Sequence, residues 1–245
     1  MRCLLLVPGD DSANFAKALT SGAEALVLDL AASSAQASLD LARQSLRDFI
    51  FGARQLAQRP RLFVRINGLE TGLASLDLDA IMPAGPDGIV LPKSRSGADV
   101  QHLGAKLAVR EAENGLPDGA CAIVPMVTET AASLFGLASY AGASQRLLGL
   151  AWNAEALASA LGARTNRLAD GAFTAPCQLA RSLTLAGARA AQVEPIDAPF
   201  TNLSDEAGLR AECEAARRDG FTGKLAIHPA QVPVINEVFA RGLTL

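Results

Sequence analysis

The chain has 245 residues, half of them hydrophobic and 4% aromatic, with 22 basic and 25 acidic residues and a formal net charge of −3. This length is typical of one α/β barrel, and the lack of a long basic run argues against a nucleic-acid surface. The apolar start before Pro8 is too short for a signal peptide or a membrane span. The four cysteines lie far apart with no CxxC pair, so we expect reduced thiols in a cytoplasmic protein.

Eight short apolar runs predict strands that are buried on both faces, because such strands read as nearly continuous runs of Val, Ile and Leu. In chain order these runs cover residues 3–7, 25–30, 62–66, 88–91, 122–127, 147–152, 194–196 and 225–227.

Amphipathic stretches between most of these runs predict helices. They cover residues 11–21, 36–54, 98–114, 129–140, 153–161, 172–188 and 206–219, and we expect a closing helix near 231–239. Helix signals are poor in the link over residues 68–85, which is the weakest part of the prediction. Alternating strands and helices favour a parallel sheet, and eight such units in about 250 residues favour a closed (β/α)8 TIM barrel of the α/β class. We expect residues 1–245 to form this barrel as a single domain.

Polar residues at the C-terminal ends of the predicted strands are the candidates for chemistry, because active sites of such barrels lie at that face. Arg65 interrupts an apolar strand, which indicates either a bidentate clamp for a substrate carboxylate or a buried ion pair with Glu129 or Asp29. Glu129 follows the fifth strand, where it could be a metal ligand, a general base or an acid near the start of the next helix.

Other strand ends leave two interpretations open in each case. Lys93 could bind a phosphate or carboxylate, or be a solvated residue at the start of a loop. His228 could lie in the core or near the site, and Asp29 could have a structural or a catalytic role. Asp197 ends the seventh strand and is a further candidate for the mouth of the barrel.

Five short motifs and a long closing block carry a family resemblance. The motifs are LLLVPGD, VRIN, GIVLPK, VTET and GLAWNAEAL, and the closing block is DEAGLRAECEAARRDGFTGKLAIHPAQVPVINEVF. Over residues 3–239 the chain resembles the HpcH/HpaI aldolase and citrate lyase β-subunit (CitE-like) superfamily. The resemblance implies a TIM barrel that binds Mg2+ and cleaves or forms a carbon–carbon bond in a citryl-, malyl- or citramalyl-CoA thioester.

The same resemblance implies roles for individual residues. Arg65 would hold the carboxylate of a keto acid, and Glu129 would bind the metal. The motifs also place further substrate-binding residues in the site, namely Pro8, Gly9, Lys93, Asn153 and Ala154. A homo-oligomer, a trimer or a hexamer, is expected as well, with an acyl-CoA or keto acid as the small-molecule partner and without a membrane or nucleic-acid partner.

The chain departs from the family pattern at acidic positions. Relatives read GAED after the sixth strand, with the Asp as second metal ligand, whereas Ala156 stands at that position here. Relatives read LDLEDAV after the second strand, whereas this chain has Ala31 and Ala32, and Arg95 replaces an acid after LPK. We therefore expect a CitE-like carbon–carbon lyase, and as the alternative a catalytically impaired barrel that binds CoA or dicarboxylates as a subunit. A thioesterase or lyase for an unrelated acyl-CoA is a third interpretation, and the sequence identifies no general base.

Overall fold

The computed structural model describes residues 1–9, 12–31 and 36–240. Its eight strands form a closed barrel in chain order, each parallel to the next, and β8 pairs with β1. The predicted (β/α)8 fold is confirmed. The strands are β1 (Cys3–Pro8), β2 (Ala25–Asp29), β3 (Arg61–Arg65), β4 (Gly88–Leu91), β5 (Ala122–Val127), β6 (Gly149–Trp152), β7 (Glu194–Asp197) and β8 (Gly223–Ala226).

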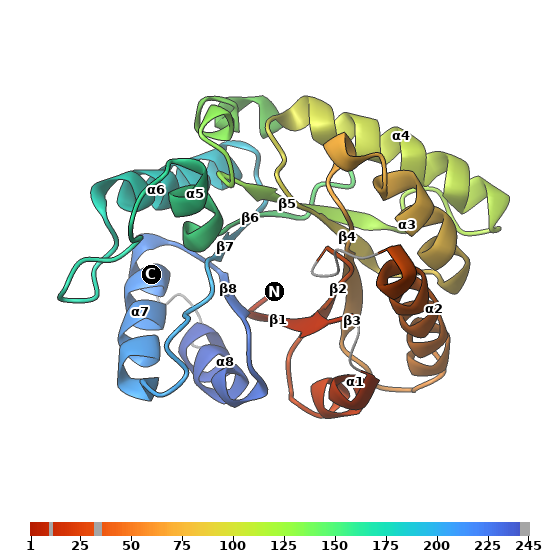
Figure 1. The fold of residues 1–245 in the computed structure, drawn as a ribbon, viewed down its shortest axis with the longest axis horizontal. Helices are drawn as coiled ribbons and strands as arrows, with labels where there is room; N and C mark the ends of the chain where they lie inside the picture. Colours follow the sequence, from red (N-terminus) through yellow and green to blue (C-terminus); the bar gives the residue numbers. More distant parts are fainter. Residues whose placement is uncertain (10–11, 32–35, 241–245) are drawn as a thin grey trace.

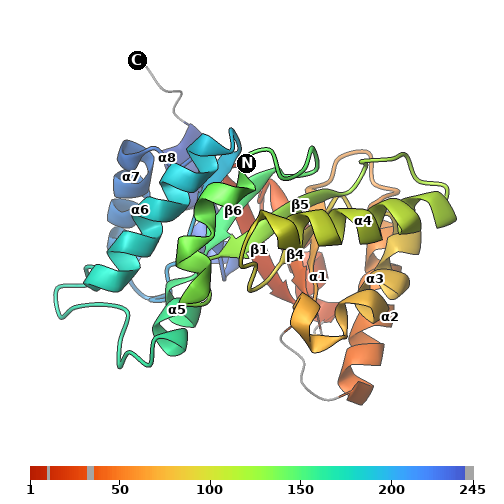
Figure 2. The ribbon, with the colours of Figure 1, turned by 90° about the horizontal axis from the view of Figure 1, so that it is seen from above.

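The α-helices surround this ring of strands (Figure 1). Figure 2 shows α6 and α7 on one flank and α2 and α3 on the other, with the strands between them. Their bounds are α1 (Ser12–Leu19), α2 (Gln36–Ala53), α3 (Ala74–Ile81), α4 (Gly97–Glu113), α5 (Ala154–Ala160), α6 (Ala175–Ala190), α7 (Glu206–Asp219) and α8 (Val232–Ala240). Across the described ranges, no helix combines the length and apolar character needed to cross a bilayer.

Two connections differ from the sequence-based expectation. The continuous helix expected over residues 129–140 is wrong, since two 3-10 segments, η3 (Ala132–Phe135) and η4 (Leu137–Tyr140), stand there. Hydrogen bonds between Thr130 and Ser133 involve both side chains and both backbones, and such local bonds compete with the α-helical pattern. The link with poor helix signals contains α3, between the 3-10 segments η1 (Leu69–Thr71) and η2 (Met82–Ala84).

Side chains alternate between the inside of the barrel and the layer under the helices. Every second residue of the strands contributes to a buried interior cluster, as Val27 and Phe63 do. Their outward neighbours pack in a second cluster against the helices. Because strand side chains alternate with a period of two, the next inward positions are Asp29 on β2 and Arg65 on β3. The alternation thus directs an acid and an arginine into the mouth of the barrel.

Candidate functional site

Arg65 and Asp29 lie side by side at the C-terminal ends of β3 and β2, where they are register partners. Arg65 Nη1 donates to Asp29 Oδ2 at 3.0 Å. The other carboxylate oxygen of Asp29 accepts a hydrogen bond from the backbone N–H of Ala31 at 2.9 Å. Asp29 is therefore fixed by its own loop and in turn orients the guanidinium group of Arg65.

Glu129 reaches the same mouth from the end of β5. Its Oε2 accepts from the backbone N–H of Lys93 at 2.7 Å, and its Oε1 lies 3.9 Å from Arg65 Nη2. The residue before it, Thr128, has a left-handed φ of 65°, which turns the chain as the strand ends. Burial raises the pKa of Glu129, and Arg65 and the Lys93 amide partly oppose that increase. The structure thus brings together the two residues that the sequence analysis placed at the centre of the site.

Two buried polar atoms next to Glu129 have no hydrogen-bond partner within the described part of the chain. They are Arg65 Nε and Thr128 Oγ1. An unpaired buried polar group costs free energy, so such atoms mark places where a ligand or an ordered water adds a bond. The sequence places Thr128 at the end of the fifth predicted strand, directly before Glu129, but it assigns no role to this residue.

Lys93 contributes to the site through its backbone and not through its ammonium group. Its side chain is 60% exposed, and Nζ lies 3.7 Å from Glu70 Oε1. Its φ of 52° lies in the left-handed region, as does that of Thr128. Two strained non-glycine residues therefore flank the Glu129 carboxylate, and strain of this kind concentrates at functional sites.

Pro8 and Gly9 form the rim of the mouth beside Asp29. Gly9 donates its N–H to the backbone oxygen of Asp29 at 3.1 Å. A Cβ atom at Gly9 would lie 2.6 Å from that oxygen, so the close approach requires glycine. Pro8 is exposed and pairs in register with Asp29. These two residues therefore help to set the position of the Asp29 backbone.

Asn153 and Ala154 continue β6 into α5. Asn153 Oδ1 accepts hydrogen bonds from the backbone N–H groups of Glu155 and Ala156, at 3.0 and 3.3 Å. Ala154 is buried. The Glu155 carboxylate is exposed and accepts from Asn166 Nδ2 at 2.9 Å, so it is engaged with the loop that follows α5.

The carboxylates of the described residues do not gather into a metal-binding cluster. No group of three His, Cys, Asp or Glu side chains there could hold a metal ion by itself. Ala156 offers no ligand oxygen in its side chain, and Ala31 gives only its amide to Asp29. Ala32 lies outside the described residues.

Asp197 does not face the mouth, so its assignment to the mouth is wrong. It lies fully buried on the outer side of the barrel, where it accepts from Trp152 Nε1 at 2.8 Å, Lys224 Nζ at 3.2 Å and Arg181 Nε at 3.1 Å. Although its burial acts in the opposite direction, Lys224 and Arg181 hold the pKa of Asp197 below its ordinary value. His228 is exposed and accepts the Ala230 N–H through Nδ1, so it is not a core residue.

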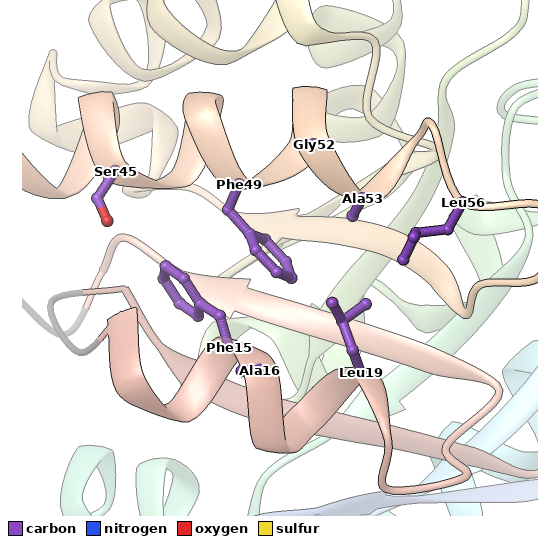
Figure 3. Close-up of a pocket in the computed structure, with 8 residues that line it drawn as sticks. All are labelled: Phe15, Ala16, Leu19, Ser45, Phe49, Gly52, Ala53 and Leu56. Atoms are coloured by element: carbon purple, nitrogen blue, oxygen red, sulfur yellow. The ribbon is translucent and has the colours of Figure 1, made fainter.

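An apolar groove of about 500 Å³ lies outside the barrel, between α1 and α2. Figure 3 shows Phe15 and Leu19 of α1 facing Phe49 of α2 across it. Ser45 is its only lining residue with a polar side chain. A groove of this composition offers nothing to bind an anionic ligand. A second cavity, of about 730 Å³, lies between α6 and α7 and is lined by polar residues that include Arg167, Arg181 and Arg218.

Comparisons with known proteins agree on one family. Residues 2–229 match the sequence model of the HpcH/HpaI aldolase/citrate lyase family. Citrate lyase subunit beta of Leuconostoc mesenteroides subsp. cremoris is 33% identical over 98% of this chain and 76% of that protein. A (3S)-malyl-CoA thioesterase of Cereibacter sphaeroides strain KD131 is 34% identical over 98% of this chain and 77% of that protein. The crystal structure of Mycobacterium tuberculosis CitE with magnesium, acetoacetate and coenzyme A superposes with a TM-score of 0.81 at 30% identity, covering 99% of this chain and 82% of that one.

Proposed function

The chain belongs to the HpcH/HpaI aldolase/citrate lyase family, and from this we propose that it is a carbon–carbon lyase for a short hydroxyacyl-CoA thioester of the citryl-, malyl- or citramalyl-CoA type. One observation carries the proposal. Arg65 stands at the barrel mouth with Nη1 fixed by Asp29 and with Nε free of any partner among the described residues. A guanidinium edge held in this way is suited to the carboxylate of a keto acid.

The reaction is a retro-Claisen cleavage of the hydroxyacyl thioester. The hydroxyl group loses its proton and becomes the carbonyl of the keto acid as the neighbouring carbon–carbon bond breaks. The bonding electron pair passes to the thioester as an enolate, which takes up a proton to give acetyl-CoA. Arg65 binds the carboxylate that stays with the keto acid, so it orients the bond that breaks and neutralises the product.

The residues present fit magnesium only in a site that the substrate completes. Glu129 would hold the ion, since Mg2+ is often bound by one or two carboxylates together with substrate oxygens and waters. Asp29 is engaged with Arg65, and position 156 is Ala. When bound, magnesium would polarise the keto oxygen and offset charge on the enolate.

A second candidate function is favoured by the missing acid. With Ala156 in place and Glu155 bonded to Asn166, the barrel could bind CoA or a dicarboxylate as a subunit or paralogue without cleaving it. In this case Arg65 would keep its role in binding, and Glu129 would serve mainly as its ion partner at 3.9 Å.

We also propose that the chain works in the cytoplasm as a homo-oligomer, a trimer or hexamer, with residues 1–245 acting as one domain. Large apolar side chains exposed on α2 support an association of copies, since Leu41 is 69% and Phe51 46% exposed. Light scattering of the purified protein tests this. A monomer at micromolar concentration would contradict the oligomer.

The test of the function is turnover. Purified protein is incubated with citryl-, (3S)-malyl- and citramalyl-CoA, with and without Mg2+, and acetyl-CoA and keto acid are measured. We expect turnover of at least one thioester, a loss of roughly a hundredfold or more in kcat/KM for Arg65→Met, and little change for Arg95→Met, a rim arginine that is 66% exposed. Binding without turnover of any thioester would favour the subunit function. If the protein neither binds nor cleaves any of these thioesters, both the lyase function and the subunit function are contradicted.

A further inference from the structure

Two aromatic rings meet in the apolar groove between α1 and α2. The ring centroids of Phe15 and Phe49 lie 4.7 Å apart, and the cavity of about 500 Å³ extends along them from Ser45 to Leu56 (Figure 3). A Cβ atom at Gly52 would meet nothing within 4 Å, so this part of the groove is open. A cavity of this size and composition can take up a large apolar side chain from another molecule.

A second apolar surface is exposed elsewhere on the barrel. Phe135 of η3 is 91% exposed, more than any other large apolar side chain of the described residues. Three leucines accompany it at the end of α5, in the connection from α5 to α6 and on α6, namely Leu161, Leu168 and Leu179, which are 40%, 53% and 56% exposed. We call these four residues the Phe135 surface.

The members of the Phe135 surface surround one buried cluster. Leu134, the chain neighbour of Phe135, packs against this cluster, and Leu157 of α5 and Cys177 of α6 are part of it. Figures 1 and 2 show α5 and α6 on the side of the barrel away from α1 and α2. One copy therefore cannot fill its apolar groove with its own Phe135 surface.

We propose that the apolar groove of one copy of this chain binds the Phe135 surface of another copy, with the Phe135 ring beside Phe15 and Phe49. This inference rests on the homo-oligomer of the proposed function and deepens it by naming the surfaces that meet. The two surfaces are different, so each copy binds one neighbour through its groove and the next through its Phe135 surface. Head-to-tail contacts of this kind close into rings, and a trimer is such a ring.

Charges near the two surfaces favour the same pairing. The outer face of α2 exposes two acids against one arginine, namely Asp40, Asp48 and Arg47, with side chains 64%, 60% and 41% exposed. The connection over residues 161–174 carries two arginines against one acid, namely Arg164, Arg167 and Asp170. Opposite excess charges guide two copies into the head-to-tail orientation and disfavour contact between two identical faces.

Two substitutions each remove one half of the contact. Phe135→Ser removes the exposed ring, and Ser45→Glu places a charge inside the groove. Neither residue is fully buried, so neither change opens a hole in the core. Val109→Ser is the matched control, because Val109 is 56% exposed on α4 and belongs to neither surface.

Light scattering measures the mass of each purified protein over a range of concentrations. We expect the dissociation constant of the oligomer to rise roughly tenfold or more for Phe135→Ser and for Ser45→Glu, as for the loss of a central aromatic contact. Val109→Ser should associate like wild type. Thermal melting checks that all three variants are folded.

A mixture of the two defective variants tests the pairing itself. Phe135→Ser keeps its groove and Ser45→Glu keeps its Phe135 surface, so one contact between the two variants is intact. At a concentration where each variant alone is dissociated, we expect the equimolar mixture to form a larger species that contains both variants and stays below the mass of a complete ring.

The outcomes separate this inference from the lyase function. The inference is overturned if either variant keeps the wild-type dissociation constant, if Val109→Ser weakens association equally, or if both variants dissociate and their mixture does not associate. If the wild-type chain is a monomer at micromolar concentration, the proposed oligomer fails together with this inference. Turnover of the CoA thioesters is measured separately on the wild-type protein, so a failure of the lyase function is distinguishable from a failure of the contact.

Discussion

At the scale of single residues, the site is a set of polar groups whose capacity for hydrogen bonds is only partly used. Arg65 has one nitrogen fixed by Asp29, a second 3.9 Å from Glu129, and a third without a partner in the described part of the chain. Thr128 adds a buried hydroxyl in a left-handed backbone conformation that a β-branched residue rarely adopts. Unpaired and strained groups destabilise the free protein, and a bound ligand offsets this cost by supplying the missing hydrogen bonds.

Substitution of Thr128 tests whether its hydroxyl is unsatisfied. We expect Thr128→Val to leave the free energy of unfolding unchanged or to raise it by up to about 1 kcal/mol, because the methyl group removes an unpaired buried donor. The matched control is Thr184→Val, at a buried threonine whose hydroxyl donates to the Ala180 carbonyl at 2.8 Å. This control should lose about 1 kcal/mol. Urea denaturation measures both, and equal losses would show that the Thr128 hydroxyl is paired.

At the scale of elements, the junction of β6 and α5 decides whether the mouth can hold a metal. The helix begins directly after Asn153, so position 156 lies in its first turn. Ala156 there leaves Glu129 without a second carboxylate. The junction therefore provides capping hydrogen bonds, and its acidic side chain, Glu155, is bonded to Asn166.

Introducing a carboxylate at position 156 tests this interpretation of the junction. We expect Ala156→Asp to tighten Mg2+ binding roughly tenfold or more, since it gives the ion a second carboxylate. Ala160→Asp, an exposed position one turn further along the same helix, is the control and should not change Mg2+ affinity. Isothermal titration with MgCl2 measures both. An unchanged affinity in Ala156→Asp would mean that position 156 does not face Glu129.

Behind the same junction, a buried ion network joins β6, β7, β8, α6 and α7. Asp197 is its centre, and it accepts from Trp152, Arg181 and Lys224. Lys224 is also fully buried and donates to Glu212 Oε1 at 2.8 Å. Breaking such a buried pair leaves an uncompensated charge, which is strongly destabilising.

Acid should weaken this network. The native fold holds the pKa of Asp197 below its ordinary value, so its contribution to stability is present above the unfolded pKa of about 3.9 and is lost as pH falls further. We expect Asp197→Asn to lower the free energy of unfolding by about 3–5 kcal/mol at neutral pH. The difference from wild type should shrink below about pH 4. Denaturation curves at neutral and acidic pH measure this, and a constant difference would contradict it.

At the scale of the whole molecule, closure of the barrel depends on β8 meeting β1. The backbone N–H of Lys224 donates to the Arg2 carbonyl at 2.9 Å, and a Cβ atom at Gly223 would lie 2.0 Å from the Met1 carbonyl oxygen. The close contact leaves no space for a side chain at this point. Glycine at position 223 is therefore a requirement of the closed ring.

Gly223→Ala should destabilise the protein by about 1–3 kcal/mol or more, because overpacking forces the backbone apart. Gly52→Ala is the control, since a Cβ atom there meets nothing within 4 Å and the residue lies inside α2. That variant should gain about 0.5–1 kcal/mol. Thermal melting of the two variants measures the contrast, and equal stabilities would show that the seam between β1 and β8 tolerates a side chain.

The sequence by itself determined the barrel and the meeting of Arg65 with Glu129. Runs of apolar residues indicate strands that are covered on both faces. Because parallel strands bring their C-terminal ends to one mouth of the barrel, Arg65 and Glu129 come together there. The sequence indicated α3 only weakly. It also predicted a helix over residues 129–140, where local hydrogen bonds of Thr130 and Ser133 favour 3-10 turns.

Only the tertiary structure decided which way the polar side chains face. Asp197 ends a strand of four residues, too short for its own alternation to reveal that it points to the helix layer and binds Lys224. The unpaired hydroxyl of Thr128 is likewise visible only in the fold, because it depends on which groups of the described residues come within reach of it. The pattern of apolar residues indicates whether a whole segment is buried. The direction of one polar side chain depends on neighbours that come together only in the folded barrel.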